Sequence, residues 1–296
     1  MESIINCKNF GDADIVLVAA NYDKTSSFGK GADKAPVEIK ICLDTQIEFF
    51  DRYSRSVPRN KKKIFYSDLG NLNSLSPEKM VARVSGEVKK ILLQNKFPII
   101  IGGEHSVTNG AIEAITGKGK ASEITIVQID AHFDLRMDDS DYNDKPYGKY
   151  AHSAVMRRAS EKGFNIVQVG IRAYSKDEFD YAKKSSRIRF FEWGNVNSKG
   201  GLFVQPSFAD IIKAITTKKV YLTIDVDGFD PSVMSETGTP VPGGFSWNYG
   251  ALLINKIFQN RDVIGADVVE VAPSSKVSQT AYNAAQLIYN MIGQRK

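Results

Sequence analysis

Short, nearly continuous apolar runs recur along the whole chain and constrain its fold more than any other feature. They lie at residues 14–20, 64–67, 98–101, 124–129, 165–171, 220–224 and 263–269. Runs of this kind, rich in Val and Ile, are typical of strands that are buried on both faces in a parallel sheet. We therefore expect these segments to form the strands of a mainly parallel sheet.

Helical patterns lie between several of these runs. The clearest has Ser76 as its N-cap and Pro77 at its first position, followed by apolar residues at helical spacing over residues 81–92. Two more helices are expected over residues 206–217 and 280–292. Alternating strands and helices predict an α/β fold with helical layers around the sheet. We expect a single domain over residues 1–296, because the sequence has no repeat and no break in composition.

Composition narrows the class of protein. Of the 296 residues, 42% are hydrophobic and 25% are charged, as in ordinary globular proteins. The formal net charge of +5 is small and spread along the chain, so no nucleic-acid partner is expected. The two cysteines, Cys7 and Cys42, lack a CxxC spacing and are expected to be free thiols. Neither a signal peptide nor an apolar run of roughly 18 residues is present, so we expect a cytoplasmic protein with no membrane partner.

Polar motifs follow three of the apolar runs at the point where each predicted strand ends. They are GGEHS at residues 102–106, DAHFD at 130–134 and DVD at 225–227. Ligands of parallel α/β sheets bind just beyond the carboxyl ends of the strands, so we expect these motifs to meet. Alternate residues of an extended segment point to one side, which places the two carboxylates and the imidazole of DAHFD together.

These motifs supply two imidazoles and four carboxylates as candidate metal ligands: His105, Asp130, His132, Asp134, Asp225 and Asp227. Carboxylates packed together resist ionisation unless cations neutralise them, so the set predicts two metal ions. A mixed Asp/His set without cysteine favours Mn²⁺, although Zn²⁺, Co²⁺ and Ni²⁺ compete for such ligands. A capping role in a helix or turn explains any single aspartate of this set. It does not explain why candidate ligands stand at alternate positions in both DAHFD and DVD.

The segments GGEHS, DAHFD and DVDGFDP, in this order, resemble the three metal-binding signatures of the ureohydrolase family of arginases and agmatinases. Residues 22–36, the GTPVPGG segment at 238–244 and the DVVEV segment at 267–271 resemble further parts of that family. The resemblance implies a three-layer α/β/α fold with a central, largely parallel, eight-stranded sheet. It also implies a homo-oligomer, either a trimer or a hexamer.

The resemblance implies a role for each candidate ligand. One Mn²⁺ ion would be held by His105, Asp130, Asp134 and Asp225. The other would be held by Asp130, His132, Asp225 and Asp227. By this resemblance, two ions about 3.5 Å apart would share a water and lower its pKa, and the resulting hydroxide would attack the guanidinium carbon of a small-molecule substrate.

Three residues would complete the catalytic machinery. Asp134 would aim the hydroxide as well as bind metal. His152, in the segment YAHSAVMRR at 150–158, would bind substrate and protonate the departing nitrogen, unless it is an ordinary loop histidine. Glu270 would accept the substrate guanidinium in a forked ion pair, unless it pairs with a basic residue of the chain.

Within the family, the YAHSAVMRR segment resembles agmatinases, which convert agmatine and water to putrescine and urea. A nearby loop carries Asp138, Asp139, Asp141 and Asp144, which would favour a substrate with an amine tail over one with a carboxylate, unless the loop is simply a solvated acidic turn. The DVDGFDP and GTPV segments look more like arginase, since Val241 stands where agmatinases commonly have Glu. Arginase, another guanidino-compound ureohydrolase and a non-catalytic scaffold therefore remain as alternatives.

Overall fold

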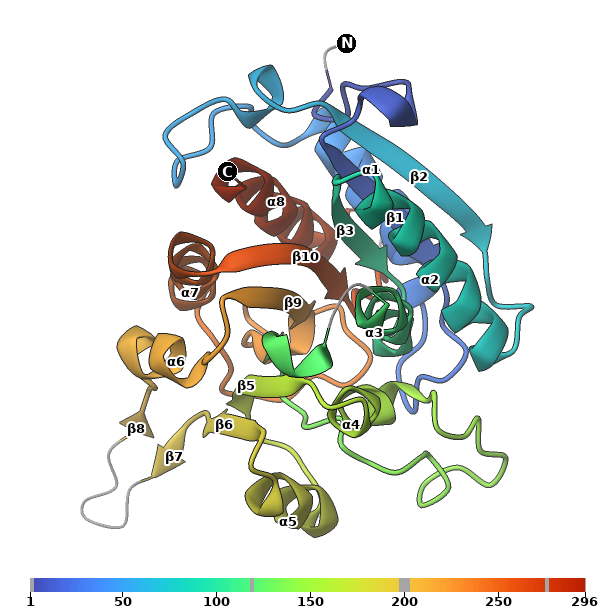
Figure 1. Cartoon of the computed structure of the whole chain (residues 1–296), viewed down its shortest axis with the longest axis vertical. Helices are drawn as coiled ribbons and strands as arrows, with labels where there is room; N and C mark the ends of the chain where they lie inside the picture. The colour runs from blue at the N-terminus through green and yellow to red at the C-terminus, as the bar shows by residue number, and fades with distance from the viewer. Residues whose placement is uncertain (1–2, 118–119, 197–202, 275–276, 296) are drawn as a thin grey trace.

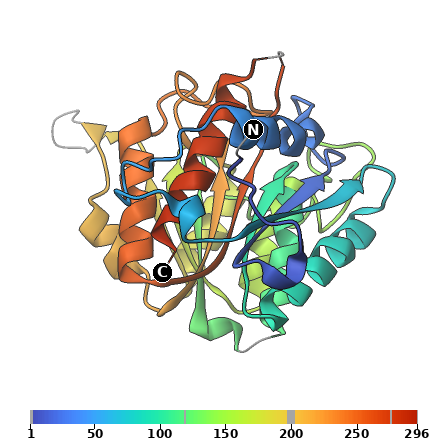
Figure 2. The ribbon, with the colours of Figure 1, turned by 90° about the horizontal axis from the view of Figure 1, so that it is seen from above.

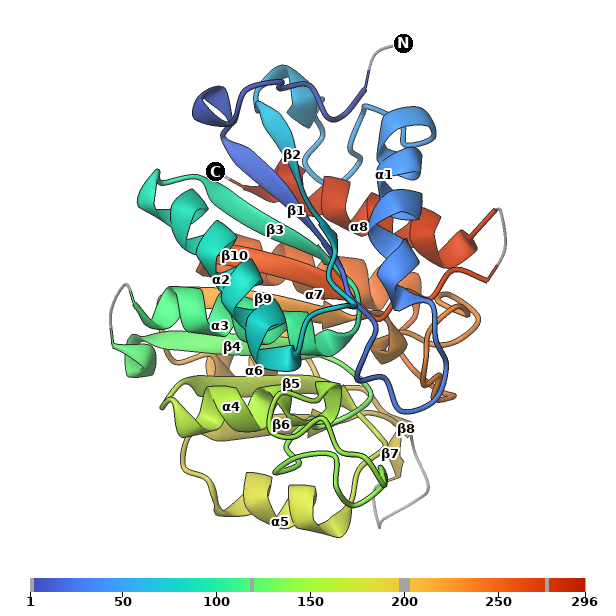
Figure 3. The ribbon, with the colours of Figure 1, turned by 90° about the vertical axis from the view of Figure 1, so that its right-hand side faces the viewer.

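The predicted strands assemble into one sheet of eight strands in the computed structural model, which describes residues 3–117, 120–196, 203–274 and 277–295. Its strands are β1 (Ile15–Asn21), β2 (Ile64–Asn71), β3 (Phe97–Gly102), β4 (Ile124–Ile129), β5 (Asn165–Ile171), β6 (Ile188–Glu192), β9 (Lys219–Asp225) and β10 (Asp262–Val269). They lie in the order β2-β1-β3-β10-β9-β4-β5-β6, and every neighbouring pair is parallel (Figure 3). The predicted α/β class and the eight-stranded parallel sheet are thereby confirmed.

Helices cover both faces of this sheet (Figures 1 and 2). One face packs against α1 (Ala35–Thr45), α6 (Phe208–Ala214), α7 (Trp247–Asn260) and α8 (Gln279–Gln294). The other packs against α2 (Pro77–Leu93), α3 (Thr108–Thr116), α4 (Val155–Glu161) and α5 (Lys176–Lys184). The strands alternate between the two cores, since Ile15 and Leu17 of β1 belong to the first and Val16 and Val18 to the second. None of the described helices is both long and apolar enough to cross a bilayer.

Short elements connect these layers. The 3-10 helices are η1 (Phe10–Asp12), η2 (Ala32–Lys34), η3 (Pro58–Asn60), η4 (His105–Val107), η5 (Ala121–Glu123), η6 (His152–Ala154) and η7 (Val226–Gly228). A separate antiparallel pair is formed by β7 (Asn195–Val196) and β8 (Phe203–Val204). Of these, η4, η6 and η7 matter most here, because each carries a residue that the sequence assigns to the candidate site.

The predicted helices are present, but one of them is shorter than expected. Ser76 caps α2 by accepting a hydrogen bond from Lys79 N, as the sequence predicts. The helix predicted over residues 206–217 is α6, which begins after its N-cap Ser207 and ends at Ala214. It stops there because the Arg261 guanidinium donates to the carbonyl oxygens of Ile212 and Ile215, which replaces a further helical turn.

Candidate metal centre

Four neighbouring strands, β3, β10, β9 and β4, deliver the candidate site residues at their carboxyl ends. Asp130 directly follows β4, Asp225 is the last residue of β9, and Glu270 directly follows β10. His105 begins η4, shortly after β3. Because these strands are parallel and adjacent, their polar ends meet at the middle of one sheet edge.

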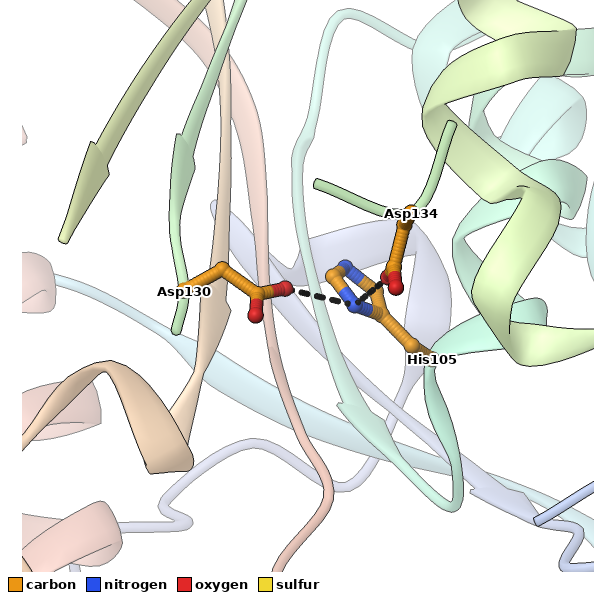
Figure 4. A group of neighbouring side chains, drawn as sticks. All are labelled: His105, Asp130 and Asp134. Atoms are coloured by element: carbon orange, nitrogen blue, oxygen red, sulfur yellow. Dashed lines mark ion pairs between the residues drawn. The ribbon is translucent and has the colours of Figure 1, made fainter. Parts of the chain in front are cut away.

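His105, Asp130 and Asp134 form the first group of candidate ligands (Figure 4). His105 Nδ1 lies 3.2 Å from Asp130 Oδ2 and 2.8 Å from Asp134 Oδ2. Asp225 Oδ2 lies 3.4 Å from the same nitrogen. All four side chains are buried. Three carboxylate oxygens thus surround one ring nitrogen, an arrangement that a divalent cation between them would satisfy.

Asp130, His132 and Asp227 form the second group. His132 Nδ1 lies 3.5 Å from Asp130 Oδ1 and 3.0 Å from Asp227 Oδ2. The other oxygen of Asp227 accepts a hydrogen bond from Ala131 N at 3.0 Å. Asp130 therefore presents one carboxylate oxygen to each histidine and is the residue that the two groups share.

The buried carboxylates of the centre need positive charge to balance their own, and the pKa values of two of them reflect this. Burial raises the pKa of Asp134 to about 6. Burial, together with the charges of Asp227 and Asp130, raises the pKa of Asp225 well above its ordinary value. Burial acts to lower the pKa of His105, but its neighbouring carboxylates raise it well above its ordinary value. His105 Nδ1 meets no partner with hydrogen-bond geometry in the described part of the chain. This donor set fits divalent cations, which would neutralise the carboxylates.

A further layer of hydrogen bonds orients the candidate ligands. The Thr223 hydroxyl lies 2.9 Å from His105 Nε2, so that Nδ1 faces the carboxylates. Gln128 Nε2 donates to Asp130 Oδ2 at 2.7 Å. Contacts of this kind fix ring and carboxylate orientation at metal sites.

His152 and Glu270 form a pair beside the first group. Glu270 Oε1 lies 3.4 Å from His152 Nδ1 and accepts a hydrogen bond from His105 N at 2.8 Å. Burial acts to lower the pKa of His152, but the hydrogen bond and charge of Glu270 raise it above its ordinary value. Conversely, burial acts to raise the pKa of Glu270, and His152 lowers it. The pair therefore favours an imidazolium next to a carboxylate.

Two of the site residues have a positive φ, a backbone conformation that residues other than glycine seldom adopt. Asp134 has φ = 52° and Glu270 has φ = 65°. Their backbones are held in place by neighbours: Asp134 O accepts from Met156 N, and Glu270 N donates to Gly103 O. Such conformations cost about 1–3 kcal/mol each and persist where surrounding contacts enforce them, often at functional sites.

A cavity of about 510 Å³ opens at this centre, and four of the sequence-predicted residues line it: His132, Asp134, His152 and Asp225. Glu270, which contacts His152, is not among the described lining residues and is 3% exposed. The lining also includes Arg136, Tyr142, Tyr174 and Glu178. The volume is in the range of about 300–1,000 Å³ that small-molecule sites occupy.

The acidic loop does not supply this cavity with carboxylates, contrary to the sequence-based expectation. None of its four aspartates, Asp138, Asp139, Asp141 and Asp144, is among the described residues that line it. Asp139 is fully buried and accepts hydrogen bonds from Tyr147 N and Gly148 N, while Asp141 forms an ion pair with Arg136. The expectation was wrong because short Asp side chains satisfy the backbone of their own loop.

The residues that orient the ligands lie outside the polar motifs and are not predicted from them. Gln128 and Thr223 are polar residues inside the apolar runs ITIVQI and VYLTID, and both are fully buried. A polar side chain within a strand buried on both faces needs a partner, and this signal points to the site. Thr239, whose hydroxyl donates to Asp227 Oδ2 at 3.3 Å, lies in the GTPVPGG segment, and the sequence pattern alone gives it no role.

Comparisons with known proteins agree with this geometry. The model of the Arginase family matches residues 13–293. The chain is 33% identical to N(1)-aminopropylagmatine ureohydrolase of Synechocystis sp., over 96% of this chain and 90% of that protein. It is 31% identical to agmatinase of Bacillus subtilis, over 95% and 91% of the respective chains. The crystal structure of agmatine ureohydrolase of Thermoplasma volcanium matches with a TM-score of 0.81 and 28% identity, over 100% of this chain and 94% of that one.

Proposed function

The chain is a ureohydrolase that belongs to the Arginase family, and we propose that it hydrolyses agmatine to putrescine and urea at a site for two Mn²⁺ ions. One observation carries the proposal: Asp130 belongs to both groups of candidate ligands, and the His152–Glu270 pair lies beside them. The six ligands of the proposal are His105, Asp130, His132, Asp134, Asp225 and Asp227. We propose Mn²⁺ as the metal because the set contains oxygen and imidazole donors and no thiolate.

Two divalent ions held by these six ligands would supply an activated water near neutral pH and would stabilise negative charge in the transition state. The residues of the chain have the remaining tasks. Asp134, which also lines the cavity, orients the attacking oxygen toward the guanidinium carbon. His152 donates a proton to the departing nitrogen, since an amide anion is not a viable leaving group. Glu270 sets the position of His152 and offers its carboxylate to the guanidinium.

The charge of the cavity supports a substrate with an amine tail. Apart from the proposed metal ligands, the lining contributes the carboxylate of Glu178, and the charge of Arg136 is balanced by Asp141. A substrate carboxylate placed here would face Glu178 without a free cation from Arg136 to pair with it. The relatives named agmatinase and agmatine ureohydrolase support the same choice.

A second candidate substrate is N(1)-aminopropylagmatine. It is favoured by the relatives from Synechocystis and from Thermococcus kodakarensis, which bear that name and are 33% and 32% identical to this chain. It shares the guanidinium of agmatine and differs only in its longer tail, so the roles proposed for the site residues apply to both compounds.

The test is urea release by the Mn²⁺-loaded protein from agmatine, N(1)-aminopropylagmatine, arginine and a guanidino acid. We expect kcat/KM for agmatine to exceed that for arginine by about 100-fold, because a few kcal/mol of like-charge repulsion gives this preference. A clear preference for the aminopropyl compound would select the second candidate. A better rate with arginine or with the guanidino acid would refute the amine-tail assignment, and no urea from any compound would refute the proposed reaction.

Three broader expectations complete the proposal. We propose that residues 1–296 form one domain, which the family match over residues 13–293 supports. We propose that the protein acts in the cytoplasm, because both cysteines are free thiols. We also propose a homo-oligomer, which sedimentation of the purified protein would test.

A further inference from the structure

The hydroxyl of Thr25 joins a buried carboxylate to the backbone of His152. Thr25 Oγ1 donates to Glu104 Oε1 at 2.7 Å and accepts a hydrogen bond from His152 N at 2.9 Å. Thr25 is 1% exposed and Glu104 is fully buried. Neither residue has a role in the reaction proposed above, so this buried connection calls for an explanation of its own.

Glu104 is also bonded to the segment that carries His105. It is the N-cap of η4, where its Oε2 accepts from Ser106 N at 2.7 Å and its Oε1 from Ser106 Oγ at 2.8 Å. Thr25 N donates to Oε1 at 3.2 Å. One carboxylate therefore holds the turn of a candidate metal ligand and, through the Thr25 hydroxyl, the start of the turn that carries the candidate proton donor.

The anchor at Glu104 is fixed to the end of β1. Gly103 N donates to Ala20 O at 3.0 Å, and Glu104 N donates to Tyr22 O at 2.9 Å. A Cβ atom at Gly103 would lie 2.0 Å from Tyr22 O, so only glycine allows this close approach. Glu104 is thus held by its backbone as well as by its side chain, and it offers a rigid point of attachment.

His152 depends on this attachment for its backbone amide. It is the first residue of η6, and the first N–H groups of a helical turn have no partner within the turn. The Thr25 hydroxyl accepts the hydrogen bond from that N–H group, while the imidazole of the same residue faces Glu270. Residues far apart in the sequence thereby fix both the backbone and the ring of His152.

We propose that Thr25 is a positioning residue that holds His152 in place for proton transfer, with Glu104 as its anchor. The inference rests on the proposed function, since it gives His152 the role of proton donor. Proton transfer requires hydrogen-bond reach between donor and acceptor, and a displacement of about 1 Å can cost about 100-fold in rate. Loss of the Thr25 hydroxyl frees the amide of His152 without removing any group that contacts metal or substrate.

The test compares Thr25→Val, which keeps the shape and removes the hydroxyl, with Thr25→Ser, which keeps the hydroxyl. Thr116→Val is the matched control, because the Thr116 hydroxyl donates to Ile112 O within α3, outside the candidate site. For each Mn²⁺-loaded protein, kcat and KM for agmatine, bound metal, and hydrogen exchange of the His152 amide are measured.

We expect Thr25→Val to lower kcat by about 10- to 100-fold, with KM and bound metal unchanged and with faster exchange at His152. Thr25→Ser and Thr116→Val should behave like the unaltered protein. A general loss of structure would instead lower metal content and raise KM as well.

Two results would overturn the inference: unchanged exchange at His152 in Thr25→Val, or faster exchange with unchanged kcat. Failure of the proposed function is a different result, in which the unaltered protein releases no urea. In that case, faster exchange in Thr25→Val alone would still establish that Thr25 holds His152, and unchanged exchange would exclude it.

Discussion

The Nε2 atom of His105 lies 2.9 Å from the hydroxyl oxygen of Thr223, on the side of the ring opposite the carboxylates. This contact orients the imidazole so that Nδ1 points at the candidate metal site. Thr223 also lies on β9, two residues before Asp225, so the same strand supplies a ligand and the group that orients another ligand.

Thr223→Val should weaken Mn²⁺ binding by about 10- to 100-fold, because the His105 ring loses the partner that fixes its orientation. Competition against a metal-binding dye measures the affinity. Thr125→Val is the matched control: Thr125 is a buried strand threonine of β4 whose hydroxyl pairs with Thr217, outside the candidate site. Equal affinities for the two variants would show that Thr223 does not orient His105.

Asp130→Asn should reduce the bound metal more than Asp227→Asn, because Asp130 is shared by both groups of ligands and Asp227 belongs to one. Metal analysis after exhaustive removal of free Mn²⁺ should give a content close to zero for the first variant and close to one ion per chain for the second. If Asp227→Asn loses metal as completely as Asp130→Asn, the two groups do not bind separate ions.

The strands, and the meeting of the candidate ligands at one edge of the sheet, can be predicted from the sequence because both follow from local pattern. Apolar runs mark strands buried on two faces, and parallel strands bring the residues that follow them to one edge. The strand β6 (Ile188–Glu192) does not stand out as an apolar run, because it is a short edge strand that carries the charged residues Arg189 and Glu192.

Contacts between distant segments leave no local pattern in the sequence from which they can be predicted. Thr25 and Glu104 are 79 residues apart, and neither lies in a pattern that indicates the other. The acidic loop shows the opposite error, because its charge suggested a ligand site while Asp139 serves the loop itself. Composition indicates which charges are present, but only the fold decides which of them face the cavity.

His152→Asn should lower kcat by about 10² to 10⁴ and leave the bound metal intact, as expected for a proton donor that is not a ligand. Steady-state urea release and metal analysis on the same preparation check both parts. Loss of metal in this variant would instead make His152 part of the metal site.

Glu236 provides a pH test of stability outside the metal centre. Burial acts to raise its pKa, but hydrogen bonds from Ser278, Ser274 and Thr280 lower it below the ordinary value. A lowered pKa in the folded protein contributes stability above the pKa of the unfolded chain, and this contribution is lost as the pH falls through the folded pKa.

Glu236→Gln should therefore reduce the free energy of unfolding by about 1 kcal/mol near pH 7, since donors at the start of α8 lose a charged acceptor. The difference from the unaltered protein should shrink as the pH falls below about 4.3. Urea denaturation across this range measures it, with Glu123→Gln on the exposed η5 turn as the control. A difference that stays constant with pH would show that the charge of Glu236 is not responsible.

The proposal of a two-metal ureohydrolase is tested by titrating the metal-free protein with Mn²⁺ and measuring urea release from agmatine. Activity should be absent without metal, rise as Mn²⁺ is added and saturate at two ions per chain. Full activity in the metal-free protein, or saturation at a single ion per chain, would contradict it.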